Sequence, residues 1–207
     1  MNIEREANTM SKIKLKTDGD RYNQLIEKKE KQLADLVALD EHEKQASKEC
    51  SQAFQRYMDA ARENTEYAKQ RLAELQADRN RAEENYNRAV ERCSELADET
   101  GRTFIAIVAE LIHDNIDVLD GMDVNSKQVF LALNEALPED IFVDTNMGDL
   151  NAVISVHGGS RNKRVCMELQ RIDYGTHILC CGKQDHFINK ERFLADYDNG
   201  EYGNTAR

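Results

Sequence analysis

The sequence predicts an α+β fold. A long N-terminal coiled-coil helix, alternatively a helical hairpin, precedes a small head of two helices, a 3–4-stranded antiparallel meander and a short C-terminal helix. Three observations support it. A stripe of apolar residues with heptad spacing runs through Ser47–Glu99, no Pro or Gly occurs between Asp20 and Thr100, and the apolar period changes from near 3.6 to near 2 after Pro138.

The heptad stripe is the strongest of these signals. From Phe54 to Leu96, positions at alternating spacings of four and three residues are mostly apolar, and the positions between them are almost all polar. A stripe this narrow is buried only against another helix, so we expect it to join copies of the chain. Arg79 interrupts the stripe, either as a register-setting residue opposite an acid or as a side chain at the seam edge. The residues expected to carry oligomerisation are Phe54, Met58, Ala61, Ala68, Leu72, Leu75, Ala82, Tyr86, Ala89 and Leu96.

The preceding helical segment begins near Asp20, a plausible N-cap, and has its own apolar face as far as Leu39. Between Asp40 and Ser47 the sequence supplies almost nothing apolar. Either the helix continues through this stretch with a stutter in the heptads, or it turns there and packs back as a helical hairpin. The absence of Gly and Pro favours the continuous helix.

Two helices are expected at the start of the head. Gly101 is predicted to end the long helix, and the next helix, Arg102–Leu119, has apolar residues over more than half of its surface. Such broad coverage is typical of a helix buried in a globular core. A second helix begins near Asn125 or Ser126 and is stopped by Pro138.

The rest of the head is predicted to be mainly strands. Candidate strands cover residues 141–144, 150–157, 164–173 and 176–182, joined in part by glycine-containing hairpin turns, and a short helix follows over 189–197. The predicted division is therefore a flexible tail at 1–19, a helical coiled-coil stalk at 20–100, the α+β head at 101–198 and a second flexible tail at 199–207.

The composition favours a cytoplasmic protein. The formal net charge is −11 at pH 7 and the mean hydropathy is −0.73. The first residues lack the apolar segment of a signal peptide, and no apolar run is long enough to span a membrane. The five cysteines are odd in number and irregular in spacing, which favours reduced thiols. We expect no membrane association and no cofactor.

The histidines and cysteines near the C-terminus do not predict a metal site or a catalytic pair. His177 and Cys180 would point to opposite faces of one strand, and His177 and Cys181 would lie about 13 Å apart along it. Nothing near these thiols predicts a stabilised thiolate, and no catalytic motif is present. The sequence therefore predicts no metal and no enzyme activity.

Charge is concentrated in two places. Residues 101–150 hold ten acidic and two basic residues, whereas the loop 157–164 concentrates positive charge beside two glycines. Acids spaced by three residues lie near one helix face, where they are either solvated or a contact surface for a basic partner. The residues predicted to bind a partner are Asp114, Asp117, Asp120, Asp123, Arg161, Lys163 and Arg164.

The leading hypothesis for function is a non-enzymatic adaptor or scaffold that binds itself through the coiled coil and presents its head to an unidentified protein. An alternative is an inhibitor from a mobile element that imitates nucleic acid with its acidic surface and binds a host DNA- or RNA-handling protein. A thiol- or metal-dependent enzyme is a second alternative. The negative charge disfavours direct nucleic-acid binding.

Overall fold

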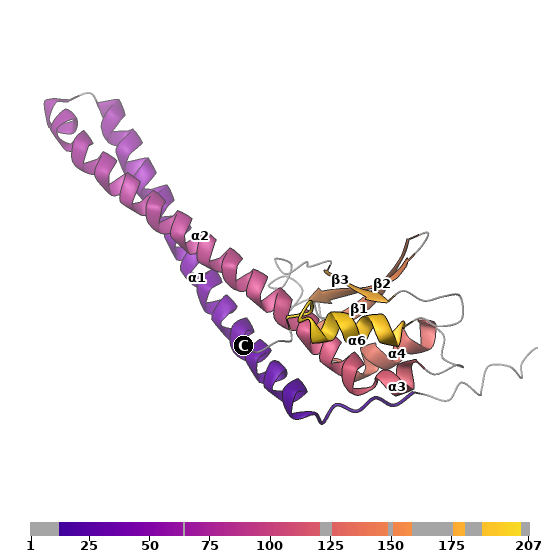
Figure 1. Cartoon of the computed structure of the whole chain (residues 1–207). Helices are drawn as coiled ribbons and strands as arrows, with labels where there is room; N and C mark the ends of the chain where they lie inside the picture. The colour runs from indigo at the N-terminus through magenta and orange to yellow at the C-terminus, as the bar shows by residue number, and fades with distance from the viewer. Residues whose placement is uncertain are drawn as a thin grey trace, which may run out of the picture. The chain divides into compact units, whose positions relative to one another are not determined.

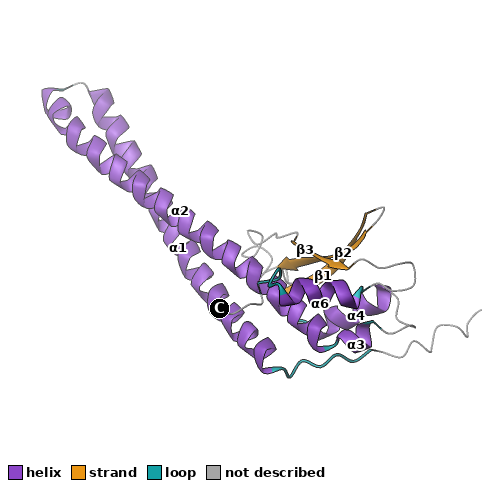
Figure 2. Ribbon diagram, in the orientation of Figure 1, coloured by secondary structure: helices purple, strands orange, loops and turns teal. Residues whose placement is uncertain are grey.

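A computed structural model of the chain describes residues 13–63, 65–120, 126–148, 151–158, 176–180 and 188–203. Figure 2 shows that helices dominate these residues, with strands confined to one part of the chain. The elements in chain order are α1 (Asp20–Glu63), α2 (Glu66–Asp114), α3 (Ile116–Leu119), α4 (Ser126–Ala136), β1 (Ile141–Gly148), β2 (Asn151–Gly158), β3 (Thr176–Cys180) and α6 (Lys190–Asp198). No helix among the described residues is both long enough and apolar enough to cross a bilayer.

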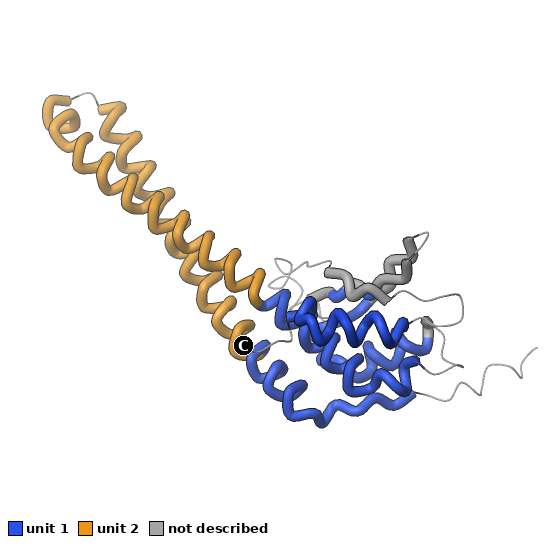
Figure 3. The backbone as a smooth tube through the Cα atoms, viewed as in Figure 1, with its two compact units in different colours: residues 1–29, 100–207 blue, residues 30–99 orange. Residues whose placement is uncertain are grey.

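The chain divides into two compact units (Figure 3). The hairpin unit consists of Glu30–Glu99, and the core unit combines Met1–Lys29 with Thr100–Arg207. Both long helices belong in part to each unit, because α1 and α2 each continue through a unit boundary.

The hairpin unit consists of two long helices packed side by side (Figure 1). A single helix over Ser47–Glu99 is therefore wrong, because α1 ends at Glu63 and the antiparallel α2 begins at Glu66. The Thr65 hydroxyl accepts a hydrogen bond from the backbone N–H of Ala68 at 3.1 Å and so caps the start of α2. Helix α2 thus begins at a polar cap, without any Gly or Pro between the two helices.

Helix α1 runs unbroken through Asp40–Ser47, as the favoured alternative expected, but the expected stutter in the heptads is absent and a helical hairpin forms further along, between α1 and α2. The heptad pattern also continues there with Glu43 and Ala46. Side chains at alternating spacings of three and four along both helices are buried or half-buried, which defines the seam of the hairpin. The seam residues are Gln32, Leu36, Leu39, Glu43, Ala46, Cys50, Ala53, Tyr57 and Ala60 on α1, and Ala68, Leu72, Leu75, Arg79, Ala82, Tyr86, Ala89, Cys93 and Leu96 on α2.

The predicted α+β fold class is wrong. Two long helices packed together dominate the structure, instead of one stalk helix followed by a head built on a 3–4-stranded meander. The strands that the structure describes are three, antiparallel and in the order β1-β2-β3, and they make up a minor part of the chain. The strand expected over 164–173 lies outside the described residues.

Gly101 does not end a helix, contrary to the prediction. Helix α2 continues through it to Asp114, and Gly101 itself is buried. A glycine inside a helix costs about 1 kcal/mol relative to alanine. Here the burial of the following turns outweighs that cost, because all residues from Thr103 to Ile112 are buried.

The core unit is organised around this buried segment of α2. As expected for the helix after Gly101, its apolar residues are covered on all sides. Ile107, Val108 and Ile112 are each 0% exposed. Helix α4 packs against β1, and α6 packs against β3. The largest fully buried side chains of the unit are Phe104, Ile107, Leu111, Ile112, Leu119, Leu133, Ile154, Ile188 and Phe193.

The outer edge of β1 is partly closed by a side chain of α4. Asn134 donates a hydrogen bond through Nδ2 to the Val143 carbonyl and accepts one through Oδ1 from the Val143 N–H, each at 2.9 Å. Val143 pairs with Val156 in the register of β1 and β2. The amide of Asn134 thus occupies one position at which a further strand would pair.

Residues 13–29 pack against the rest of the core unit, although the first seven of them fall in the predicted tail. Asn115 donates to the Lys16 carbonyl and accepts from the Lys16 N–H, at 3.0 and 2.7 Å. Lys29 forms a 2.7 Å ion pair with Asp140, and the two side chains are only 5% and 16% exposed. Burial, together with the nearby Asp140 carboxylate, raises the pKa of Tyr22.

Candidate protein-binding groove on the helical hairpin

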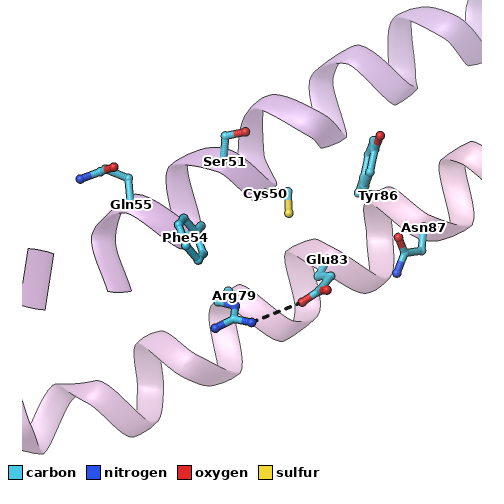
Figure 4. Close-up of a pocket in the computed structure, with 8 residues that line it drawn as sticks. All are labelled: Cys50, Ser51, Phe54, Gln55, Arg79, Glu83, Tyr86 and Asn87. Carbon is cyan, nitrogen blue, oxygen red and sulfur yellow. Dashed lines mark ion pairs between the residues drawn. The ribbon is translucent and has the colours of Figure 1, made fainter. Parts of the chain in front are cut away.

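An open groove of about 590 Å³ lies along one side of the hairpin seam. Figure 4 shows Cys50 and Phe54 of α1 directed toward the helix that carries Arg79 and Glu83. The side chains that line the groove are Cys50, Ser51, Phe54 and Gln55 from α1, and Arg79, Glu83, Tyr86 and Asn87 from α2.

Arg79 is the charged seam residue that the groove exposes. Its guanidinium carbon lies 5.6 Å from the ring centroids of both Phe54 and Tyr57, and an Nη atom lies 3.9 Å from a carboxylate oxygen of Glu83. The acid that it meets is therefore on its own helix, and its contact with α1 is a cation–π contact. Arg79 fits at the seam because two aromatic rings face its guanidinium.

Phe54 is the most unusual residue of the groove, since 47% of its surface is exposed. It follows the seam residue Ala53, just as Val90 follows the seam residue Ala89. In an antiparallel helix pair these following positions border the same side of the seam. Val90 is 38% exposed, so one side of the hairpin carries two incompletely covered apolar side chains.

The other side of the seam differs in charge. A second open groove of about 510 Å³ is lined partly by Asp35, Glu95 and Glu99, against a single basic residue, Arg92. The first groove instead combines one acid, one base and two amides. The two sides of the hairpin therefore differ in their charged residues.

Most of the residues predicted to carry oligomerisation have a partner inside the chain. Those on α2, from Ala68 to Leu96, lie at the seam with α1. Phe54, Met58 and Ala61 belong to α1 and lie outside its seam, because the chain reversal between α1 and α2 breaks the predicted stripe. An assembly role for these ten residues stays a prediction.

The sequence does not predict this groove, because the heptad positions of α1 that line it are only weakly apolar. Glu43, Ala46 and Cys50 continue the three–four spacing from Leu36 and Leu39, but they contribute little apolar character. The heptad spacing of these α1 residues, taken without regard to their hydrophobicity, is the sequence signal that indicates the α1 side of the groove.

The predicted acidic surface is partly neutralised. Lys190 at the start of α6 forms an ion pair with Asp117, and its hydrogen bond holds the pKa of Asp117 below the usual range. The same hydrogen bond raises the pKa of Lys190, and Asp120 adds a smaller effect in the same direction. Asp114 lies beside His113, with Nδ1 and Oδ1 3.3 Å apart. The acids on this surface are therefore not a uniform negative row.

Several predicted site residues lie outside the described residues. These are Asp123 and the loop residues Arg161, Lys163 and Arg164. Of the cysteines and histidines near the C-terminus, Cys181 and His186 also lie outside the described residues, and only the backbone of His177 and Cys180 in β3 is described.

Comparison with known proteins identifies no relative: no family model, no curated protein and no solved structure matches the chain.

Proposed function

We propose that this chain is a non-enzymatic protein-binding protein that forms a dimer through the groove on its hairpin unit. The core unit is then left to bind a second, different protein, as an adaptor does. The proposal includes a cytoplasmic location, which the pattern of cysteines favours.

The exposure of Phe54 is the observation that carries this proposal. A half-exposed phenylalanine beside an open groove loses contact with water when a partner covers it. Covering the exposed half of the ring contributes about 1 kcal/mol on each copy. Val90 on the same side of the seam extends the apolar surface.

A second copy is the proposed occupant because the groove carries one acid and one base, which can pair with the opposite charges of an identical groove. With a two-fold axis beside Phe54, Arg79 of one copy would approach Glu83 of the other and each Phe54 ring would enter the opposite groove. Across this proposed interface, the side-chain amides of Gln55 and Asn87 can form hydrogen bonds with the amides of the other copy, with the Arg79 guanidinium or with the Glu83 carboxylate.

The composition of the seam also supports association. Of the nine seam residues on α1, only Leu36, Leu39 and Tyr57 are large apolar side chains. Helices in water depend mostly on tertiary packing for their stability, and two hairpins side by side form a four-helix arrangement that buries more surface.

The test is the solution mass of the full chain by light scattering after size exclusion. We expect wild type at twice 23.7 kDa and Phe54→Asp at the monomer mass. Val37→Asp is the matched control, because Val37 is also 47% exposed but lies on an outer face of α1. It should remain a dimer.

Circular dichroism on both variants checks that the helices are retained. A monomeric wild-type chain at tens of micromolar contradicts dimerisation. A dimer that persists in Phe54→Asp, with both variants folded, contradicts the groove as its interface.

A further inference from the structure

The last turns of α2 carry a group of metal-ligating side chains. Glu110, His113 and Asp114 each offer one ligand atom, and these atoms all lie within 4.8 Å of one another. Their spacing of three and four residues places them on one face of the helix. We propose that this turn binds a divalent first-row transition metal ion.

The donor set fits this class of ion. One imidazole nitrogen with two carboxylate oxygens is a mixed set that Zn²⁺, Mn²⁺ and Co²⁺ accept, whereas Mg²⁺ and Ca²⁺ prefer oxygen alone. Three protein ligands leave a coordination position for water.

Tyr197 of α6 holds two of the three ligands in place. Its hydroxyl donates a hydrogen bond to Glu110 Oε2, and its ring stacks on the imidazole of His113 with the centroids 4.2 Å apart and the planes 13° from parallel. Such outer contacts orient metal ligands. Tyr197 is therefore a positioning residue for the proposed site.

The burial of the group leaves one side open to an ion. Glu110 and Tyr197 are 5% and 8% exposed, whereas the side chains of His113 and Asp114 are 38% and 32% exposed. An ion can reach the group from the side of His113 and Asp114. It would then meet a carboxylate already removed from water, which strengthens its attraction.

The buried Glu110 carboxylate already has a cation beside it. Arg21 Nε lies 3.4 Å from Glu110 Oε2, and the Arg21 side chain is 41% exposed. A divalent ion at the site would replace this guanidinium, which is free to move into solvent. Arg21 is thus a competitor of the ion, and substituting it distinguishes metal binding from a purely structural ion pair.

The test is titration of the metal-free full chain with Zn²⁺ by calorimetry, and with Co²⁺ by visible absorption. We expect one ion per chain at the site. His113→Ala and Glu110→Gln should each weaken this binding at least tenfold, and Tyr197→Phe by about tenfold, as outer-shell changes do. Arg21→Gln should tighten it several-fold because the competing charge is removed.

His42→Ala is the matched control, because His42 is an exposed histidine of the hairpin unit and should not affect binding. Absorption of bound Co²⁺ in the near ultraviolet would identify thiolate ligands and so separate any ion held by cysteines. Absence of binding at millimolar Zn²⁺ overturns the proposal. So does equal binding by wild type and folded His113→Ala, and weaker binding by Arg21→Gln contradicts the competition.

Discussion

Helix α2 passes through two different environments, and the contrast explains much of the molecule. In the hairpin unit it touches α1 along a narrow seam that includes Arg79 and several alanines. In the core unit, from Thr103 to Ile112, every residue of the same helix is buried. One continuous helix thus has a partly solvated part in the hairpin unit, residues 66–99, and a shorter, largely enclosed part in the core unit, residues 100–114. These two parts are called the hairpin half and the core half of α2.

The difference indicates where the stability of the chain resides. A fully buried side chain loses far more apolar surface to water on unfolding than a half-buried one. Segments with few buried apolar contacts open at lower free energy than the core. The hairpin half of α2 should therefore open locally while the core half stays folded, unless a partner covers the hairpin.

The largest expected effect comes from removing the same side chain in the two halves. Leu111→Ala in the core half should lower the free energy of unfolding by about 2–5 kcal/mol, because Leu111 is 1% exposed and leaves a cavity. Leu72→Ala in the hairpin half should cost no more than about 2 kcal/mol, because Leu72 is only half-buried. Urea unfolding followed by circular dichroism measures both. Equal costs would remove the contrast.

The next effect concerns ion pairs in the two units. Lys29→Met leaves the Asp140 carboxylate without its buried partner and should cost about 3 kcal/mol. Lys44→Met breaks the pair with Asp40 on the hairpin, where the lysine side chain is 64% exposed, and should leave the unfolding midpoint unchanged. Thermal unfolding of both variants checks this. Similar losses in the two would show that burial does not separate these pairs.

A smaller effect of opposite sign is expected at Gln32 of the hairpin seam. Its side chain is 5% exposed, and neither polar atom of its amide has a hydrogen-bond partner among the described residues. Gln32→Leu should therefore stabilise the hairpin unit by about 1 kcal/mol, because it removes an unsatisfied buried amide. Gln52→Leu, at an exposed position of the same helix, is the control and should not stabilise. Hydrogen exchange of α1 amides gives the comparison, and loss of stability in Gln32→Leu would contradict it.

The smallest effect concerns the exposed charges of the core unit. Lys190→Gln should raise the pKa of Asp117 toward its usual range, because the hydrogen bond from Lys190 is what lowers it. A lowered carboxyl pKa stabilises the folded state above the unfolded pKa, and this contribution is lost as the pH falls through the folded value. An NMR titration of the Asp117 carboxyl carbon measures the shift. An unchanged value would show that the pair does not persist in solution.

The sequence predicted the elements that depend on repeated local signals. The α2 part of the apolar stripe lies at a helix seam, and the broad apolar face after Gly101 belongs to a buried helix. The prediction from sequence was wrong at the point where the helix ends and the chain reverses. Thr65 caps the start of α2 after the chain has reversed. The stripe residues before and after Thr65 appear continuous in the sequence because their spacing happens to match.

The candidate groove could not be predicted from one helix alone. Its lining combines residues such as Cys50 and Tyr86, which become neighbours only because the chain reverses between α1 and α2. Similarly, the three-residue spacing of Asp114 and Asp117 is visible in the sequence. Lys190, which forms an ion pair with Asp117, lies 73 residues from Asp117 along the chain. Long-range contacts of this kind leave no local pattern.

Hydrogen exchange along α2 at two protein concentrations tests the central claim most directly. We expect slow exchange at 104–112 at both concentrations. Exchange at 79–90 should be faster in dilute protein and should slow as the concentration rises and a second copy covers the groove. Equal exchange in the two halves of α2, or exchange at 79–90 that does not depend on concentration, would contradict the account.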